Sequence, residues 1–160
     1  MNSSSSLFPA HQAIVTTALN LDLDFLAPFL IANLPSVDIP QLLLEYKKFL
    51  AIKVIAEDTS APLLLSPSIL IDQVWHAHLL DTAKYRAACS ELGVTIDHNP
   101  AGAEDMVLVR DKRLKMTRAF YKTVFFEAPS EQFWGHQQEY LLVQGGGVEG
   151  KETMKEMKFC

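Results

Sequence analysis

Residues 66–100 read SPSILIDQVWHAHLLDTAKYRAACSELGVTIDHNP, and this stretch predicts the helix that organises the protein. Ser66 is a suitable N-cap, and the proline after it suits the first helical position. Apolar residues then recur at helical spacing until Gly93, a natural stop because glycine accepts the left-handed conformation that ends many helices. We expect one uninterrupted helix over residues 67–91, followed by a loop that contains His98.

The rest of the chain shows helical patterns and no β-hairpin signal. Further helices are expected over residues 9–21, 22–34 (with a kink at Pro28), 38–58, 103–125 and 131–143. The sequence therefore predicts an all-α fold, a compact orthogonal bundle of five or six helices in one domain over residues 9–143. Residues 1–8 are expected to be a disordered N-terminus, and residues 144–160 a flexible, glycine-rich and charged tail.

The helix expected over residues 38–58 is amphipathic. Its apolar face is predicted to consist of Leu42, Leu43, Tyr46, Phe49 and Leu50. Lys47 and Lys48 are predicted to face solvent.

Composition limits the classes of function. The 160 residues are 49% hydrophobic, which excludes wholesale disorder, and a formal net charge of −5 argues against nucleic acid as a partner. Two cysteines are too few for a disulfide framework, so a reducing compartment is expected. The sequence shows neither a signal peptide nor a membrane-spanning run, and we expect a cytoplasmic protein without a membrane partner.

Candidate metal ligands follow from the rotation of the expected helix. Each residue advances by about 100°, so His76 and His78 point about 200° apart and are not expected to share an ion. Asp72 lies one turn before His76 on the same face. With His98 from the following loop, these residues form a candidate site for zinc or another divalent metal, with open coordination positions.

A structural role for the same residues is the favoured interpretation. A carboxylate four residues before a histidine often fixes the orientation of the ring, so Asp72, His76 and His98 are expected to form a buried polar network. Trp75 and Tyr85 are expected to pack in the core around this network.

Two arginines, Arg110 and Arg113, fall on the apolar face of the helix expected over residues 103–125. A buried guanidinium needs a partner, and the acids near the histidine helix are Asp72, Asp81 and Asp97. We expect one arginine to pair with one of these acids. The alternative is that both side chains extend to the rim and reach solvent.

The string IDQVWHAHLLDT, with the later Tyr85, Cys89 and DHNP, resembles a motif of glycine-rich domain-containing proteins and their short relatives. The family pattern is Asp-x-x-Trp-His-x-His-Leu-Leu followed by a His-x-Pro loop, and the resemblance covers residues 37–135. It implies an all-helical module without an established activity. The chain carries no RNA-recognition sequence after the module, so RNA binding does not carry over.

Three classes of function remain open. The leading hypothesis is a non-enzymatic intracellular interaction module with a protein partner, because no nucleophile–base pair or phosphate-binding loop is evident. One alternative is a metal-binding protein or metal-dependent hydrolase that uses Asp72, His76 and His98, with Asp97 or Glu104 as proton acceptor. The other is a small-ligand carrier whose pocket lies between the histidine helix and the helix of Arg110.

Overall fold

The computed structural model describes residues 8–99 and 107–135, and all regular structure there is helical. In chain order the elements are α1 (Pro9–Leu19), the 3-10 turn η1 (Asp24–Leu26), α2 (Ala27–Asn33), α3 (Ile39–Ile55), α4 (Ile69–Leu80), α5 (Thr82–Leu92), α6 (Val107–Phe125) and α7 (Glu131–Trp134). The all-α prediction is confirmed. The predicted disordered and flexible ends, apart from Phe8, lie outside the described residues.

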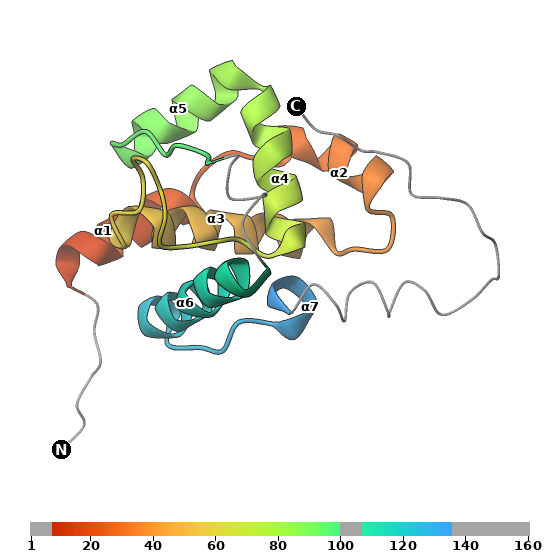
Figure 1. Cartoon of the computed structure of the whole chain (residues 1–160). Coiled ribbons are helices and arrows are strands. Elements are labelled where there is room, and N and C mark those ends of the chain that lie inside the picture. The colour runs from red at the N-terminus through yellow and green to blue at the C-terminus, as the bar shows by residue number, and fades with distance from the viewer. Residues whose placement is uncertain (1–7, 100–106, 136–160) are drawn as a thin grey trace.

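The central element is α3, which contacts α1, α2, α4 and α6 (Figure 1). It begins where the sequence predicts, because the Asp38 carboxylate accepts a hydrogen bond from the Gln41 amide at 3.1 Å and Pro40 lies in the first turn. Side chains are buried on several sides of this helix, including Leu42, Leu43, Ala51 and Ile52. A helix buried in this way is the core of a bundle.

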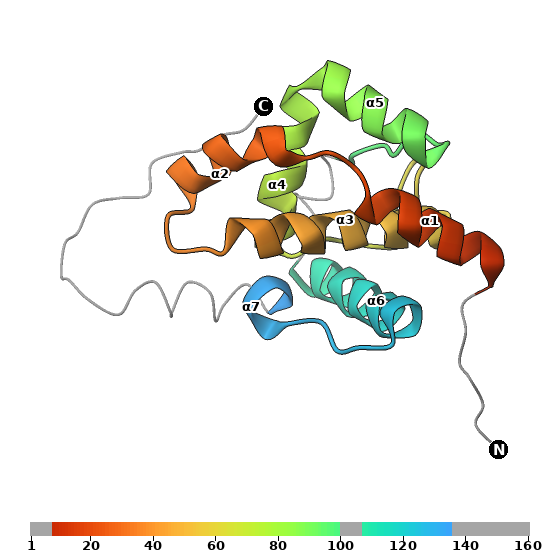
Figure 2. The ribbon, with the colours of Figure 1, turned by 180° about the vertical axis from the view of Figure 1, so that it is seen from behind.

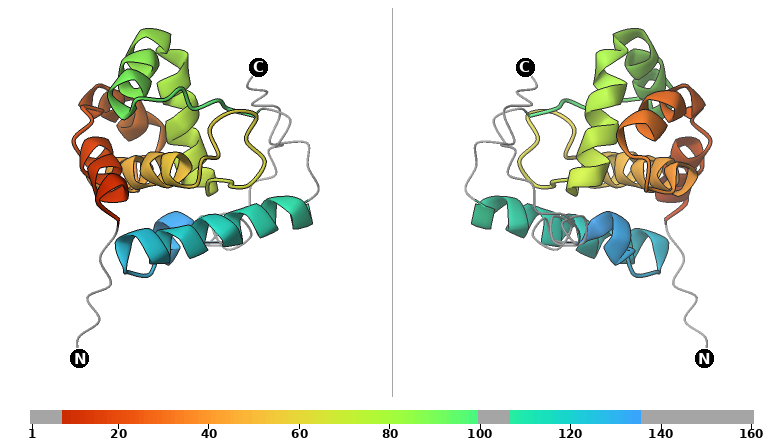
Figure 3. Two further views of the ribbon diagram at one scale, coloured as in Figure 1. Left: turned by 90° about the vertical axis from the view of Figure 1, so that its left-hand side faces the viewer. Right: turned by 90° about the vertical axis from the view of Figure 1, so that its right-hand side faces the viewer.

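The other helices surround α3. In the side views of Figure 3, α6 and α7 lie on one side of α3, and α4 and α5 lie on the other. Figure 2 shows α1 along one end of α3 and α2 over the opposite end. A single hydrophobic core joins these elements, from Leu21 through Phe49 and Ile71 to Trp134.

The expected helix over residues 67–91 is two helices, and this part of the prediction is wrong. Asp81 leaves the helical conformation, with φ −91° and ψ 78°, and its carboxylate caps α5 by accepting a hydrogen bond from the Lys84 amide. The N-cap of α4 is Ser68 rather than Ser66. The predicted stop is confirmed, because Gly93 has φ +74°. The break lets α4 pack on α3 while α5 packs on α1.

The predicted exposure of the two lysines on α3 is also wrong. The Lys48 side chain is only 12% exposed, and its ammonium contacts Glu45, Glu127 and the Tyr121 hydroxyl. Lys47 is half-buried and donates a hydrogen bond to the Leu19 carbonyl. Both ammonium groups therefore join α3 to other parts of the chain.

Within the described residues, no single helix is long and apolar enough to cross a membrane. One pair reaches the required length and composition together, Pro9–Leu19 with Asp24–Asn33, and it is bent by 42°.

Candidate metal centre

The two histidines of α4 point in different directions, as their spacing predicts. The His78 side chain is fully buried, with Nδ1 2.9 Å from the Tyr46 hydroxyl. Burial lowers the pKa of His78 to about 4, so its ring is neutral at pH 7. His76 lies at the surface with 38% of its side chain exposed. No common ion is within reach of both rings.

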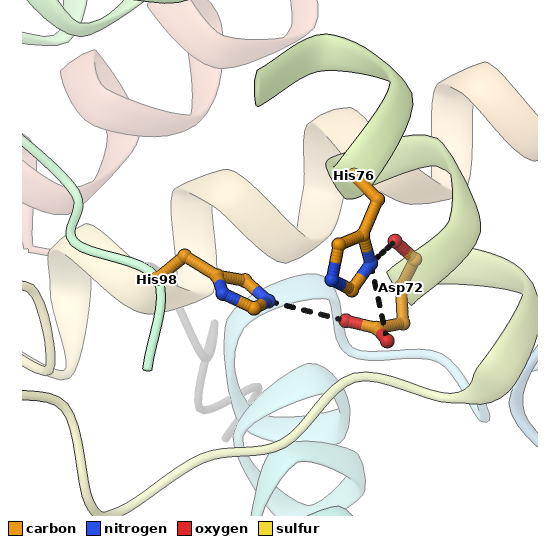
Figure 4. A group of neighbouring side chains, drawn as sticks. All are labelled: Asp72, His76 and His98. Carbon is orange, nitrogen blue, oxygen red and sulfur yellow. Dashed lines mark hydrogen bonds and ion pairs between the residues drawn. The ribbon is translucent and has the colours of Figure 1, made fainter. Parts of the chain in front are cut away.

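Asp72, His76 and His98 come together as the sequence predicts (Figure 4). His76 Nδ1 is 3.3 Å from Asp72 Oδ2, and His98 Nε2 is 3.7 Å from Asp72 Oδ1. The two imidazole rings have centroids 4.5 Å apart. The site is more open than expected for a buried network, since 40% of the Asp72 side chain is exposed.

The protonation of His76 follows from its hydrogen bond within α4. Nδ1 lies 2.8 Å from the backbone carbonyl oxygen of Asp72, one turn earlier. Because a carbonyl oxygen only accepts hydrogen bonds, Nδ1 carries the proton and the neutral ring has its lone pair on Nε2. Figure 4 shows this second nitrogen facing the space between His98 and the Asp72 carboxylate. A histidine that donates through one nitrogen and offers the other is typical of metal ligands.

The loop that carries His98 is held on both sides of that residue. Before it, the Tyr85 hydroxyl donates a hydrogen bond of 2.6 Å to the Ile96 carbonyl, and the Trp75 indole donates to the same hydroxyl. The Asp97 amide and the Asn99 side chain bond carbonyls of the loop that joins α3 to α4. The His98 ring also packs edge-on against Trp75, with centroids 4.7 Å apart.

A buried ion pair that the sequence analysis missed lies behind this loop. Lys53 Nζ is 2.7 Å from Asp58 Oδ2, and the two side chains are 1% and 6% exposed. Burial lowers the pKa of Lys53, and Asp58 partly restores it. Burial alone raises the pKa of Asp58, but hydrogen bonds from Lys53 and from backbone amides outweigh it, so the pKa lies below its ordinary value.

Helical spacing could have revealed the buried charges of α3. Glu45 and Lys53 lie three and eleven residues after Leu42, on the same stripe as Phe49. Both are almost fully buried. A charge on an apolar stripe needs a partner, as argued for Arg110 and Arg113. By the same argument, Glu45 and Lys53 are identified as buried, paired charges.

The expected pairing of Arg110 or Arg113 with a nearby aspartate is not found. Both arginines are half-buried rather than buried, and among residues 8–99 and 107–135 no ion pair joins either one to Asp72, Asp81 or Asp97. A third arginine of α6, Arg118, is also half-buried. It pairs with Glu131 and donates a hydrogen bond of 2.7 Å to the Trp134 carbonyl.

The donor set suits a transition metal better than calcium or magnesium, because two of the three ligands are imidazoles. One ligand atom from each residue lies within 4.8 Å of the others. Donors around a tetrahedral zinc ion are about 3.3 Å apart, so the side chains must close by roughly 1 to 1.5 Å. The partial exposure of Asp72 and His76 leaves their side chains room to rotate.

A separate hollow of about 520 Å³ lies at the C-terminal end of α5, lined by Tyr85, Cys89 and Val94 among others. Arg86 and Ser90 are the further α5 residues in its lining. This hollow differs in place from the carrier pocket predicted beside the helix of Arg110.

Comparison of the chain with models of protein families, with curated protein sequences and with solved structures finds no match.

Proposed function

We propose that this protein is a helical module that binds one divalent transition metal ion, with zinc the best fit, through Asp72, His76 and His98. The observation that carries the proposal is the convergence of three donors from α4 and the loop after α5. Two details support it: the His76 tautomer leaves the Nε2 lone pair available, and hydrogen bonds within the protein hold the loop of His98.

Three protein ligands leave coordination positions open, as in catalytic rather than structural zinc sites. A bound ion of this kind supplies a Lewis acid and lowers the pKa of a coordinated water. Asp72 and His76 are both partly exposed, so an external ligand or substrate has access to the open positions. The same two-histidine, one-carboxylate set also suits iron(II), and the measurement below therefore compares several metals.

The competing proposal is an interaction module in which the three side chains form only a structural network. It is favoured by the apolar side chains Leu63 and Leu64, which are 65% and 40% exposed on the loop beside His98. Under this proposal the His76→Ala variant loses about 1–3 kcal/mol of stability and no metal is bound. Membership of the family of glycine-rich domain-containing proteins is a proposal that rests on the motif. It is compatible with either role.

Metal analysis of protein purified without a histidine tag tests the proposal. We expect one equivalent of zinc by elemental analysis, and tight binding of zinc to the stripped protein by calorimetry. Titrations with cobalt(II), nickel(II) and iron(II) under the same conditions rank the metals. The visible spectrum of the cobalt(II) form reports how many ligands surround the ion.

The variants His76→Ala and His98→Ala are expected to lose the metal during purification and to bind added zinc more weakly than the wild type, because each leaves only two protein ligands. His11→Ala is the matched control, since His11 lies on α1 and outside the cluster. Circular dichroism confirms that each variant is folded. Wild-type protein without stoichiometric metal, or a folded His76→Ala variant that keeps it, contradicts the proposal.

A further inference from the structure

The loop between α3 and α4 is organised around one carboxylate. Asp58 Oδ1 accepts hydrogen bonds from the amides of Leu63 and Leu64 at 3.0 and 3.1 Å, and Oδ2 accepts one from Leu65 at 3.0 Å. Oδ2 also receives the Lys53 ammonium at 2.7 Å. Four donors thus fix the path of residues 58–65, and a carboxylate with so many donors holds its segment rigidly.

This loop in turn supports the two neighbours of His98. The Asp97 amide donates a 2.7 Å hydrogen bond to the Thr59 carbonyl, and Asn99 Nδ2 donates a 3.3 Å bond to the Pro62 carbonyl. Both acceptors lie within the segment that Asp58 folds. The backbone of His98 therefore takes its position from a loop more than thirty residues earlier in the chain.

The ion pair of Lys53 and Asp58 is also linked to the His98 ring through Trp75. Lys53 Nζ lies 5.7 Å from the centre of the Trp75 ring, and Trp75 packs edge-on against His98. On one side of the site, Trp75 therefore lies against the Lys53 ammonium. On the other side, the loop of His98 is hydrogen-bonded to the segment that Asp58 folds. Loss of the Asp58 charge disturbs both supports at once.

We propose that Asp58 is a positioning residue for the metal site, holding His98 at the correct distance from Asp72 and His76 through the folded loop of residues 59–65. The inference rests on the proposed metal-binding function. Asp58 makes no contact with the ion in this scheme. It acts as the outer partners of metal ligands do, by restricting where a ligand lies before the ion arrives.

The variant Asp58→Asn tests the proposal, because it removes the charge and keeps the size of the side chain. We expect zinc binding to weaken by about 10–100-fold, the range found for outer partners of metal ligands. Glu45→Gln is the matched control: Glu45 is also a buried carboxylate with several donors, and its contacts lie in α3, α6 and α7. Its zinc affinity is expected to equal that of the wild type.

A double-mutant cycle separates positioning from general loosening of the fold. In a His98→Ala background, Asp58→Asn is expected to cause no further loss of affinity, because the ligand that it positions is gone. Equal zinc affinity of the Asp58→Asn and wild-type proteins overturns the proposal. So does an equal loss in the presence and absence of His98.

Nuclear magnetic resonance of the metal-free protein provides a test that does not depend on zinc. Because the Trp75 ring packs edge-on against His98, with centroids 4.7 Å apart, the imidazole resonances of His98 are expected to be shifted, and Asp58→Asn is expected to move them towards those of a free histidine. If the wild type binds no zinc, the proposed function fails and these resonances still decide whether Asp58 positions His98. If Asp58→Asn does not fold, Asn99→Ala removes the hydrogen bond to the Pro62 carbonyl, and unchanged affinity and resonances in that variant overturn the proposal.

Discussion

His78 shows how a single buried side chain links the fold to pH. Its ring has no exposed surface, it contacts Tyr46, and its Nε2 has no hydrogen-bond partner among the described residues. Burial keeps water from the ring and lowers its pKa to about 4, although the Lys84 backbone and the Asp81 carboxylate act in the opposite direction.

The pKa of His78 predicts a loss of stability in mild acid. The unfolded chain binds a proton near pH 6.5, whereas the folded protein binds it near pH 4. The contribution of the neutral His78 ring to the free energy of unfolding is therefore complete above pH 6.5 and is lost as the pH falls through about 4. It amounts to up to about 3 kcal/mol in total. Urea unfolding of the wild type and of His78→Gln at several pH values between 7 and 4 measures it.

The expected result is a flatter pH dependence for His78→Gln than for the wild type. The control is His11→Gln, which removes a histidine of α1 that is not buried. An unchanged slope in His78→Gln contradicts the assignment of this pH dependence to His78.

The boundary between α4 and α5 is the main result at the scale of elements. Apolar and aromatic side chains continue at helical spacing across it, so periodicity alone predicts one helix. The local signal for a break is present in Asp81, a good N-cap residue, followed by Thr82. Tertiary packing decides in favour of the break, because α4 and α5 contact different helices, α3 and α1.

Asp81 is expected to stabilise the start of α5. Asp81→Ala removes the acceptor for the Lys84 amide, whose hydrogen bond to Oδ1 is 3.1 Å, and should lower the free energy of unfolding by about 1 kcal/mol. Asp81→Ser keeps an acceptor and should recover most of this loss. Urea unfolding monitored by circular dichroism compares the three proteins. Equal stability of Asp81→Ala and wild type would show that the cap contributes nothing.

At the scale of the whole molecule, a polar cluster attaches α6 and α7 to α3. Glu45 is 2% exposed and accepts hydrogen bonds from the Trp134 indole at 2.8 Å and the Tyr121 hydroxyl at 3.3 Å. Lys48 lies against the same hydroxyl at 2.7 Å and against Glu127 at 2.5 Å. The pKa of Glu127 is lowered, chiefly by its hydrogen bond with Lys48. The Tyr121 hydroxyl thus joins α6 to α3, and the Trp134 indole joins α7 to α3 through Glu45.

Removal of that phenol should weaken the whole domain. Tyr121→Phe leaves a ring of nearly the same size but deletes the contacts to Lys48, Glu45 and Glu127, at an expected cost of about 1–3 kcal/mol. Thr123→Ala is the control on α6, since that hydroxyl is exposed and bonds only a carbonyl of its own helix. Urea unfolding monitored by fluorescence and by circular dichroism should give one shared transition for each protein. Separate transitions would show that α6 and α7 do not unfold with the rest.

Local chemistry in the sequence determined the helical class and several boundaries. The start of α3 near Asp38 and the stop at Gly93 were predicted because they depend only on adjacent residues. The divergence of His76 and His78 was predicted for the same reason, since it follows from the geometry of one helix. The meeting of Asp72 and His98 required only that the chain turn back after Gly93.

The tertiary structure alone decided which partner each buried charge meets and what holds His98. Lys53 and Asp58 stabilise each other beneath a loop, and that loop contacts residues 97–99 across a large separation in sequence. Arg118 meets Glu131 because α7 folds back onto α6. Spacing within one segment does not encode such contacts, since they depend on how separate segments pack against one another.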